Sequence, residues 1–113
     1  MATAHKEPEI RESLALRAKD LVSFQEGSIV SRTLLKRQTG NVTLFAFDDA
    51  QGLSEHTSPF DALVQVLEGE MEISIDGKPL KVESGEIVLM PANHPHALKA
   101  LIKAKMLLTM IRA

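Results

Sequence analysis

Residues 70–82 read Glu-Met-Glu-Ile-Ser-Ile-Asp-Gly-Lys-Pro-Leu-Lys-Val, and this stretch decides the fold class. Asp76-Gly77 supplies two residues that accept the positive φ angles of a tight hairpin turn. Before and after that turn, apolar residues fill every second position: Met71, Ile73, Ile75, Leu80 and Val82. This alternation is the period of a strand with one buried face. The stretch therefore predicts a β-hairpin.

Short β-patterns continue on both sides of this hairpin. Further strands are predicted over residues 28–36, 42–47, 62–67 and 87–90, separated by turns rich in Gly, Asp, Asn, Ser and Pro. The apolar run over residues 62–67 is typical of a strand covered on both faces. Many short strands at even spacing favour an all-β sandwich or barrel.

The two ends of the chain are less regular. In a leader of residues 1–20, apolar side chains from Ile10 recur at helical spacing after Pro8, which predicts a short helix or turn. The tail over residues 97–112 has the composition of a helix. Its apolar residues also alternate, however, and closing a barrel needs strands there. We therefore predict a β tail and assign residues 21–113 to the barrel.

Length and composition exclude several classes of protein. A chain of 113 residues forms one domain, and its net charge of -2 offers no basic stripe for nucleic acid. Because cysteine is absent, disulfides and thiolate sites are excluded. The polar leader around His5 has no signal-peptide core, and no apolar run is long enough to span a membrane. We expect a soluble, cytoplasmic protein.

The segment from His56 to His96 resembles the cupin family in two short motifs. The first motif has a glycine, two histidines, a glutamate and a glycine. These positions hold Ala50, His56, Ser58, Ala62 and Gly69. The second motif has a glycine, a proline, a glycine, a histidine and an asparagine. These positions hold Gly85, Pro91, Asn93, His96 and Ala100. The run Val66-Leu67-Glu68-Gly69-Glu70 is also similar to one common in these barrels. The resemblance implies a double-stranded β-helix, or jelly-roll barrel.

The resemblance also implies a place for a metal. In metal-binding cupins, three histidines and a glutamate converge on one divalent ion inside the barrel. This chain keeps His56 and His96, while Ser58 and Ala62 stand at the other two positions. His94, on the predicted loop before His96, is the remaining candidate ligand. The cofactor is thus one divalent transition metal (Fe, Mn, Ni, Cu or Zn) held by these three histidines, or none. Without a metal, His56 and His96 would hydrogen-bond to each other, to Ser58 or to water.

Two classes of function stay open, so the sequence does not decide whether the chain is an enzyme. The first is a module that binds a small organic ligand in a pocket. That pocket is lined by His56, Ser58, Ala62, Met90 and His96. The second is a metal-dependent enzyme, of dioxygenase or isomerase type, that uses His56, His96 and His94. If His56 and His96 share an ion, their ring nitrogens should lie about 3–4 Å apart.

A homodimer is the expected assembly. Small barrels of this family often pair through strands, and the apolar tail from Leu101 to Ile111 offers shared surface.

Overall fold

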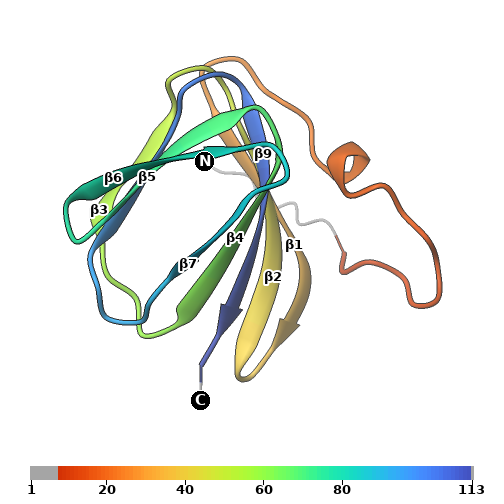
Figure 1. The fold of residues 1–113 in the computed structure, drawn as a ribbon. Coiled ribbons are helices and arrows are strands. Elements are labelled where there is room, and N and C mark those ends of the chain that lie inside the picture. The colour runs from red at the N-terminus through yellow and green to blue at the C-terminus, as the bar shows by residue number, and fades with distance from the viewer. Residues whose placement is uncertain (1–7, 113) are drawn as a thin grey trace.

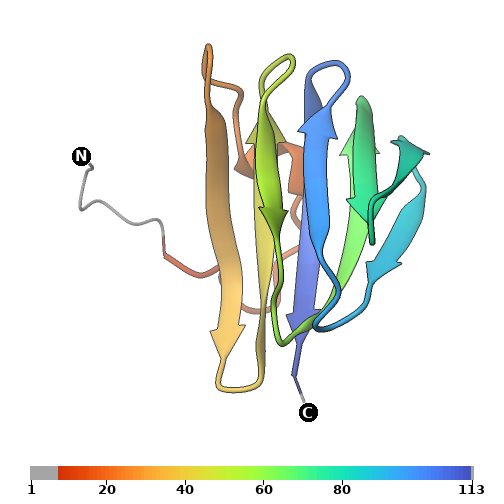
Figure 2. The same ribbon diagram turned by 90° about the vertical axis from the view of Figure 1, so that its left-hand side faces the viewer.

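The computed structural model describes residues 8–112 as two antiparallel sheets packed face to face (Figure 1). In spatial order, the larger sheet contains β1 (Ile29–Arg37), β2 (Gly40–Phe47), β9 (Ala104–Ile111), β4 (Asp61–Glu68) and β7 (Ile87–Met90). The smaller sheet contains β3 (Gly52–His56), β8 (His96–Ala100), β5 (Glu70–Ile75) and β6 (Lys78–Glu83). Figure 2 shows the molecule after a quarter turn, with the strands running nearly parallel to one another in projection. The predicted all-β jelly roll is confirmed.

Residues 1–7 and Ala113 lie outside the described part of the chain, so His5 and the first seven residues of the predicted leader are not placed. Within residues 8–112, no helix has the length and apolar character needed to cross a membrane.

The hairpin predicted from residues 70–82 is β5 and β6. Its turn residues Asp76 and Gly77 have φ angles of 53° and 79°, as a tight turn requires. Met71, Ile73 and Val82 point into the space between the sheets and are buried. Leu80 keeps 46% of its surface exposed because β6 is an edge strand.

The main core lies between the two sheets. Both sheets contribute side chains that are fully buried there: Phe47, Val64, Val66, Met71, Ile73 and Met106. Burial of this apolar surface, at about 25 cal/mol per Å², supplies most of the force that holds the sheets together. Met71, Met90 and Met106 serve as core side chains, which an irregular barrel interior accommodates well.

The tail is β, as predicted against its local propensity. The tail forms the strands β8 and β9, and β9 lies between β2 and β4 in the larger sheet. Every residue of β9 is therefore opposite a partner strand on at least one side. This pairing outweighs the helical preference of Lys, Leu and Met, which amounts to a few tenths of a kcal/mol per residue.

The predicted N-terminal helix is reduced to one 3-10 turn, η1 (Ala18–Leu21). Residues 8–10 lie against β1 instead, where the backbone N–H of Ile10 donates to the carbonyl of Leu34 at 3.1 Å, and residues 11–17 form an exposed turn and loop. Leu14 and Leu16 remain exposed, so the helical spacing of these residues buries no common face.

A second apolar cluster lies on the outer face of the larger sheet. Residues 18–24 cover that face over β1, β2 and β9, on the side away from the smaller sheet (Figure 1). Beyond this cover the outer face is open. Leu63 of β4 is 40% exposed, whereas its neighbour Val64 is fully buried. The prediction that residues 62–67 are covered on both faces was therefore wrong for the outer face.

Candidate functional site

One end of the barrel contains a partly enclosed, mainly apolar cavity of about 220 Å³, with the exposed residue His56 on its wall. Three of its lining residues carry polar side-chain atoms, namely His56, Ser58 and His96. The remaining lining residues are apolar and come from both sheets: Phe45, Leu53, Ala62, Met90, Leu98, Met106, Leu108 and Met110. The structure thus gathers all five residues of the predicted pocket around one space.

A β-bulge aims His56 into this cavity. In the ladder between β3 and β8, Leu53 is opposite Leu98 and His56 is opposite His96. Three positions on β3 therefore match two on β8. Because side chains alternate between faces, regular pairing from the inward-facing Leu53 would turn His56 outward. The extra residue reverses this parity, which is a known way for a bulge to redirect a side chain.

His56 and His96 meet through their rings. Their Nε2 atoms are 3.1 Å apart, and the ring planes cross at 73°. This separation agrees with the distance of about 3–4 Å expected from the sequence. It also suits a direct hydrogen bond in which one Nε2–H donates to the other Nε2.

Each ring is also held at its second nitrogen by a backbone carbonyl two residues earlier. Nδ1 of His56 lies 2.7 Å from the carbonyl oxygen of Ser54, and Nδ1 of His96 lies 3.2 Å from that of His94. A carbonyl oxygen can only accept a hydrogen bond, so these contacts require a proton on each Nδ1. The backbone therefore orients both rings so that both Nε2 atoms point at each other.

Burial sets the charge of His96. Its side chain lies among apolar neighbours, with only 4% of the residue exposed. Desolvation is the main reason that the pKa of His96 is lowered, and the nearby His56 lowers the pKa further. The contact with the His94 carbonyl opposes both effects. At neutral pH this arrangement favours the uncharged ring.

Ser58, Ala62 and Met90 complete the wall without adding a charge. The hydroxyl oxygen of Ser58 accepts the backbone N–H of Phe60 at 3.1 Å, so it caps the loop after β3. Ala62 and Met90 face each other across β4 and β7. Both are about 2% exposed and offer only apolar surface to the cavity apart from the Met90 sulfur.

His94 is not brought to the other two histidines. Its Nδ1 lies 2.9 Å from Oδ2 of Asp76, on the exposed loop that faces the β5–β6 turn. Among residues 8–112, no three side chains of His, Cys, Asp or Glu come together closely enough to hold a metal ion.

The donor set does not fit a resident metal held by protein side chains. Two imidazole nitrogens are close enough to bind one ion at the usual 2.0–2.2 Å. The other two family positions hold a hydroxyl that already caps a loop and a methyl group. Neither supplies the negative charge that a carboxylate gives to a divalent ion.

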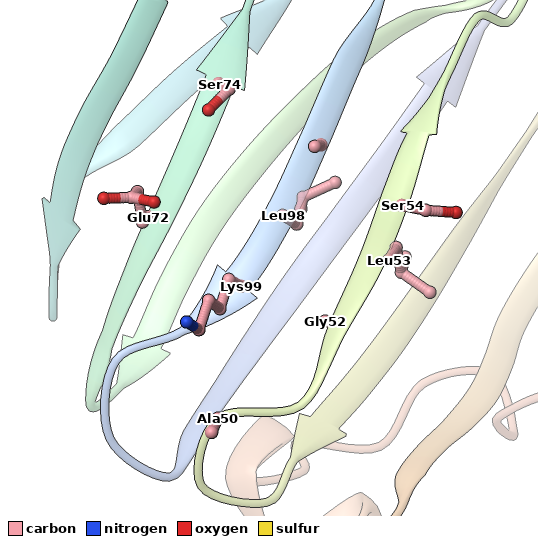
Figure 3. A pocket seen from close by; sticks show the side chains of 9 residues that line it. Ala50, Gly52, Leu53, Ser54, Glu72, Ser74, Leu98 and Lys99 are labelled. Atoms are coloured by element: carbon pink, nitrogen blue, oxygen red, sulfur yellow. The ribbon is translucent and has the colours of Figure 1, made fainter.

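A second, larger hollow of about 410 Å³ lies on the outer surface of the smaller sheet (Figure 3). Small or polar side chains such as Ser54, Ser74, Glu72 and Lys99 line it. Glu72 and Lys99 stand opposite each other in the ladder of β5 and β8. This hollow is more open to solvent and contains no histidine pair, so the cavity beside His56 and His96 is the stronger candidate despite its smaller volume.

Comparison with known proteins agrees with this geometry. The family model described as a cupin domain matches residues 44–112, which is more than half of the chain. The chain belongs to the cupin family. Among curated proteins, none matches the sequence.

Several solved structures resemble this cupin. A conserved protein of unknown function from Streptococcus pyogenes is 34% identical, with a TM-score of 0.89 over 99% of this chain and 98% of that one. A cupin 2 conserved barrel domain protein from Leptotrichia buccalis is 40% identical, with a TM-score of 0.81 over 83% of this chain and 46% of that one. A cupin superfamily protein from Desulfitobacterium hafniense, at 24% identity and a TM-score of 0.84, shares the fold.

Sequence reasoning missed about half of the cavity wall. Phe45, Leu53 and Leu98 were not identified as lining residues, nor were Met106, Leu108 and Met110 from β9. The alternation of β9 contained the signal, since the three β9 residues occupy every second position. Which of the alternating β9 side chains face the cavity could be determined only once β9 was placed between β2 and β4.

Proposed function

We propose that this cupin binds a small organic molecule in the cavity beside His56 and His96. The observation that carries the proposal is the cavity itself: a partly enclosed, mainly apolar space whose only polar lining side chains among the described residues are His56, Ser58 and His96. Protein interiors are close-packed, and voids of this size are uncommon unless they serve a ligand. A volume of about 220 Å³ lies below the usual range for drug-sized ligands, so the ligand is small.

The methionines provide a direct test of binding. Three of the five methionines, Met90, Met106 and Met110, line the cavity, whereas Met71 is buried in the same core away from it. With methyl-labelled methionine, small organic fragments should shift the three cavity resonances and leave Met71 nearly unchanged. If a fragment shifted all core methyls equally, or none at any accessible concentration, the proposal would fail.

A cavity-filling variant strengthens this test. Ala62→Leu adds three carbon atoms inside the cavity and should reduce fragment affinity at least about tenfold by occupying the site. Gln65→Ala changes the outer face of the same strand and should bind as the parent does. Equal affinity in Ala62→Leu and the parent would place the fragment elsewhere.

A metal-dependent dioxygenase or isomerase is the second candidate. The observation in its favour is the 3.1 Å approach of the two Nε2 atoms, which suits two ligands of one ion. It ranks second because Ser58 and Ala62 supply no charged donor and His94 is directed at Asp76. Elemental analysis of protein prepared without a tag or chelator tests it. Stoichiometric metal that is lost in His56→Ala and His96→Ala would reverse the ranking.

A further inference from the structure

One row of side chains on the larger sheet forms a slot in the cavity wall. Ala62 of β4 is opposite Met110 of β9 in one ladder and opposite Met90 of β7 in the other, so the three residues lie at the same level. All three side chains line the cavity. Because the methyl group of Ala62 is much shorter than its neighbours, the row has a gap in its middle with a thioether on each side.

The width of this slot follows from the geometry of the sheet. Neighbouring strands lie about 4.8 Å apart, so β9 and β7 are about 9.6 Å apart across β4. A methionine sulfur in favourable contact with an aromatic ring lies about 5 Å from it. A flat ring that stands over Ala62, midway between the two outer strands, can therefore contact the sulfur atoms of Met90 and Met110 at the same time.

The rest of the wall is also aromatic and rich in sulfur. Phe45 of β2 is opposite Met106 of β9, and both line the cavity. The Phe45 ring stacks on that of Phe47, with the ring centroids 5.8 Å apart. Thioethers and aromatic rings are polarisable and make specific contacts with a second ring. This wall therefore favours an aromatic ligand over a saturated one of the same size.

The wall offers no counter-charge to a ligand. None of the side chains that line the cavity, all of which belong to residues 8–112, is Asp, Glu, Lys or Arg. Ala62 stands at the glutamate position of the family motif, so the substitution that opens the slot also removes a carboxylate. A charged ligand would lose hydration there without gaining an ion pair, which is unfavourable in a mainly apolar site. An uncharged ligand is therefore favoured.

The volume limits the ligand to about one ring. An apolar cavity of about 150 Å³ in a protein core is enough to bind benzene. The cavity of about 220 Å³ thus has room for one ring with a small substituent. His56, Ser58 and His96 are the lining side chains that can hydrogen-bond to such a substituent if it is polar.

We propose that the ligand is a small, uncharged molecule with a single aromatic ring, which stands over Ala62 between Met90 and Met110. This inference rests on the proposed function and names the chemical class of its ligand. Binding changes no covalent bond of the ligand. The faces of the ring contact the two thioethers, and one edge of the ring lies over the Ala62 methyl group.

A matched pair of probes tests the aromatic character of the ligand. Phenol and cyclohexanol are titrated into the intact protein while the methionine methyl resonances are followed. Phenol should bind at least about threefold more tightly, because only its ring makes sulfur–aromatic contacts. Charged probes test the second property. Benzoate and benzylammonium should each bind at least about tenfold more weakly than benzyl alcohol, which has a similar shape and no charge.

Methionine variants separate the sulfur contacts from the burial of apolar surface. Met90→Leu and Met110→Leu nearly conserve side-chain volume and remove the sulfur, so each should reduce the preference for phenol while cyclohexanol affinity stays within about twofold. Met71→Leu is the matched control, since Met71 is buried in the same core and does not line the cavity. This variant should keep the full preference for phenol.

The methyl resonances also report how the ring is oriented. Protons above the face of an aromatic ring are shielded, so bound phenol should move the methyl protons of both Met90 and Met110 upfield. Cyclohexanol has no ring current and should not produce this pattern. Downfield movement of both methyl resonances would place the methionines at the ring edge and overturn the proposed orientation.

The outcomes distinguish this inference from the proposed function. If phenol and cyclohexanol bind equally, or if Met90→Leu and Met110→Leu keep the full preference for phenol, the aromatic class is wrong while the proposed function stands. Benzoate that binds as tightly as benzyl alcohol would show that the ligand need not be uncharged. If no probe binds and no fragment shifts Met90 or Met110, both proposals are wrong.

Discussion

His56 illustrates how far single residues could be read from the sequence. Its spacing from Ser58, Ala62 and Gly69 identified the family motif, and with it the end of the barrel where the cavity lies. The β-bulge that turns the His56 ring inward could not be predicted from the residues Ser54 and Glu55, because a bulge depends on how β3 pairs with β8. The two carbonyl contacts that orient the rings were equally unreadable, since they involve backbone atoms.

His94 shows the opposite case. The sequence allowed it to swing toward His96 as a third ligand, because a loop residue is not bound by strand parity. In the structure Asp76, at the distant hairpin turn, pairs with it at 2.9 Å. A contact between residues 18 positions apart depends on the packing of the β5–β6 turn against this loop.

The lowered pKa of His96 predicts how stability depends on pH. The unfolded chain binds a proton at this residue near the ordinary pKa of about 6.5, whereas the folded protein does so only at lower pH. Below about 6.5 the unfolded state therefore holds more protons, and the free energy of unfolding should fall as pH falls. The slope from this residue is at most about 1.4 kcal/mol per pH unit.

Urea denaturation between pH 7.5 and 5.5 measures this slope. His96→Asn should flatten it, and the outer-face variant Gln65→Ala, which removes no titratable group, should leave it as in the parent. A parent protein that is equally stable throughout this range would contradict the burial argument.

At the scale of elements, alternation predicted the strands well and the coverage of their faces less well. The β5–β6 hairpin was found because apolar and polar residues alternate on both sides of Asp76-Gly77, and β7 was found as a short apolar run between the Ser84-Gly85 turn and Pro91. The helical spacing of residues 10–21 was misleading, since most of that segment is an exposed turn and loop and only Ala18–Leu21 forms a 3-10 turn. Helical spacing among a few apolar residues is weak support for a helix when no other part of the protein packs against the apolar face that the helix would have.

At the scale of elements, we predict how much stability is lost when alanine replaces either of two turn glycines. Gly69 and Gly77 both have φ near +80°, so alanine at either site carries a backbone penalty of about 1–2 kcal/mol. A Cβ at Gly77 meets nothing, whereas one at Gly69 collides with the backbone carbonyl of Lys103. Gly69→Ala should therefore lower the free energy of unfolding by about 1–3 kcal/mol more than Gly77→Ala. Chemical denaturation of the two variants checks the difference, and equal losses would mean that the β8–β9 turn yields freely.

At the scale of the whole molecule, the outer face of the larger sheet is covered over one half only. Four apolar side chains stand on the uncovered half, on β4, β7 and β9: Leu63, Ile87, Leu89 and Ile111. Ile87, Leu89 and Ile111 are each about 60% exposed. Leu63 and Leu89 are directly opposite each other in the ladder, and exposed apolar side chains on and beside an edge strand are typical of an interface.

We expect two copies of the chain to pair through this patch. The sequence predicted a homodimer through the apolar tail. Of that tail, only the outward residues of β9 and the β8–β9 turn remain accessible, because Ala104 and Met106 are fully buried. Sedimentation equilibrium should give a dimer at micromolar concentration, and Ile87→Lys with Leu89→Glu should give a folded monomer. Leu80→Lys, on the edge of the other sheet, is the control that should remain dimeric. A monomeric parent protein would rule out this assembly.

The position of β9 also determines when the molecule can fold during its synthesis. β9 is the last strand of the described chain, yet it lies between β2 and β4 at the centre of the larger sheet. Until residues 104–111 leave the ribosome, β2 and β4 each present an open edge, and the cavity lacks the wall that β9 provides. The nascent chain must carry two half-sheets with exposed backbone groups, a state that is prone to mispairing. The barrel and its cavity can therefore form only once β9 is in place between β2 and β4.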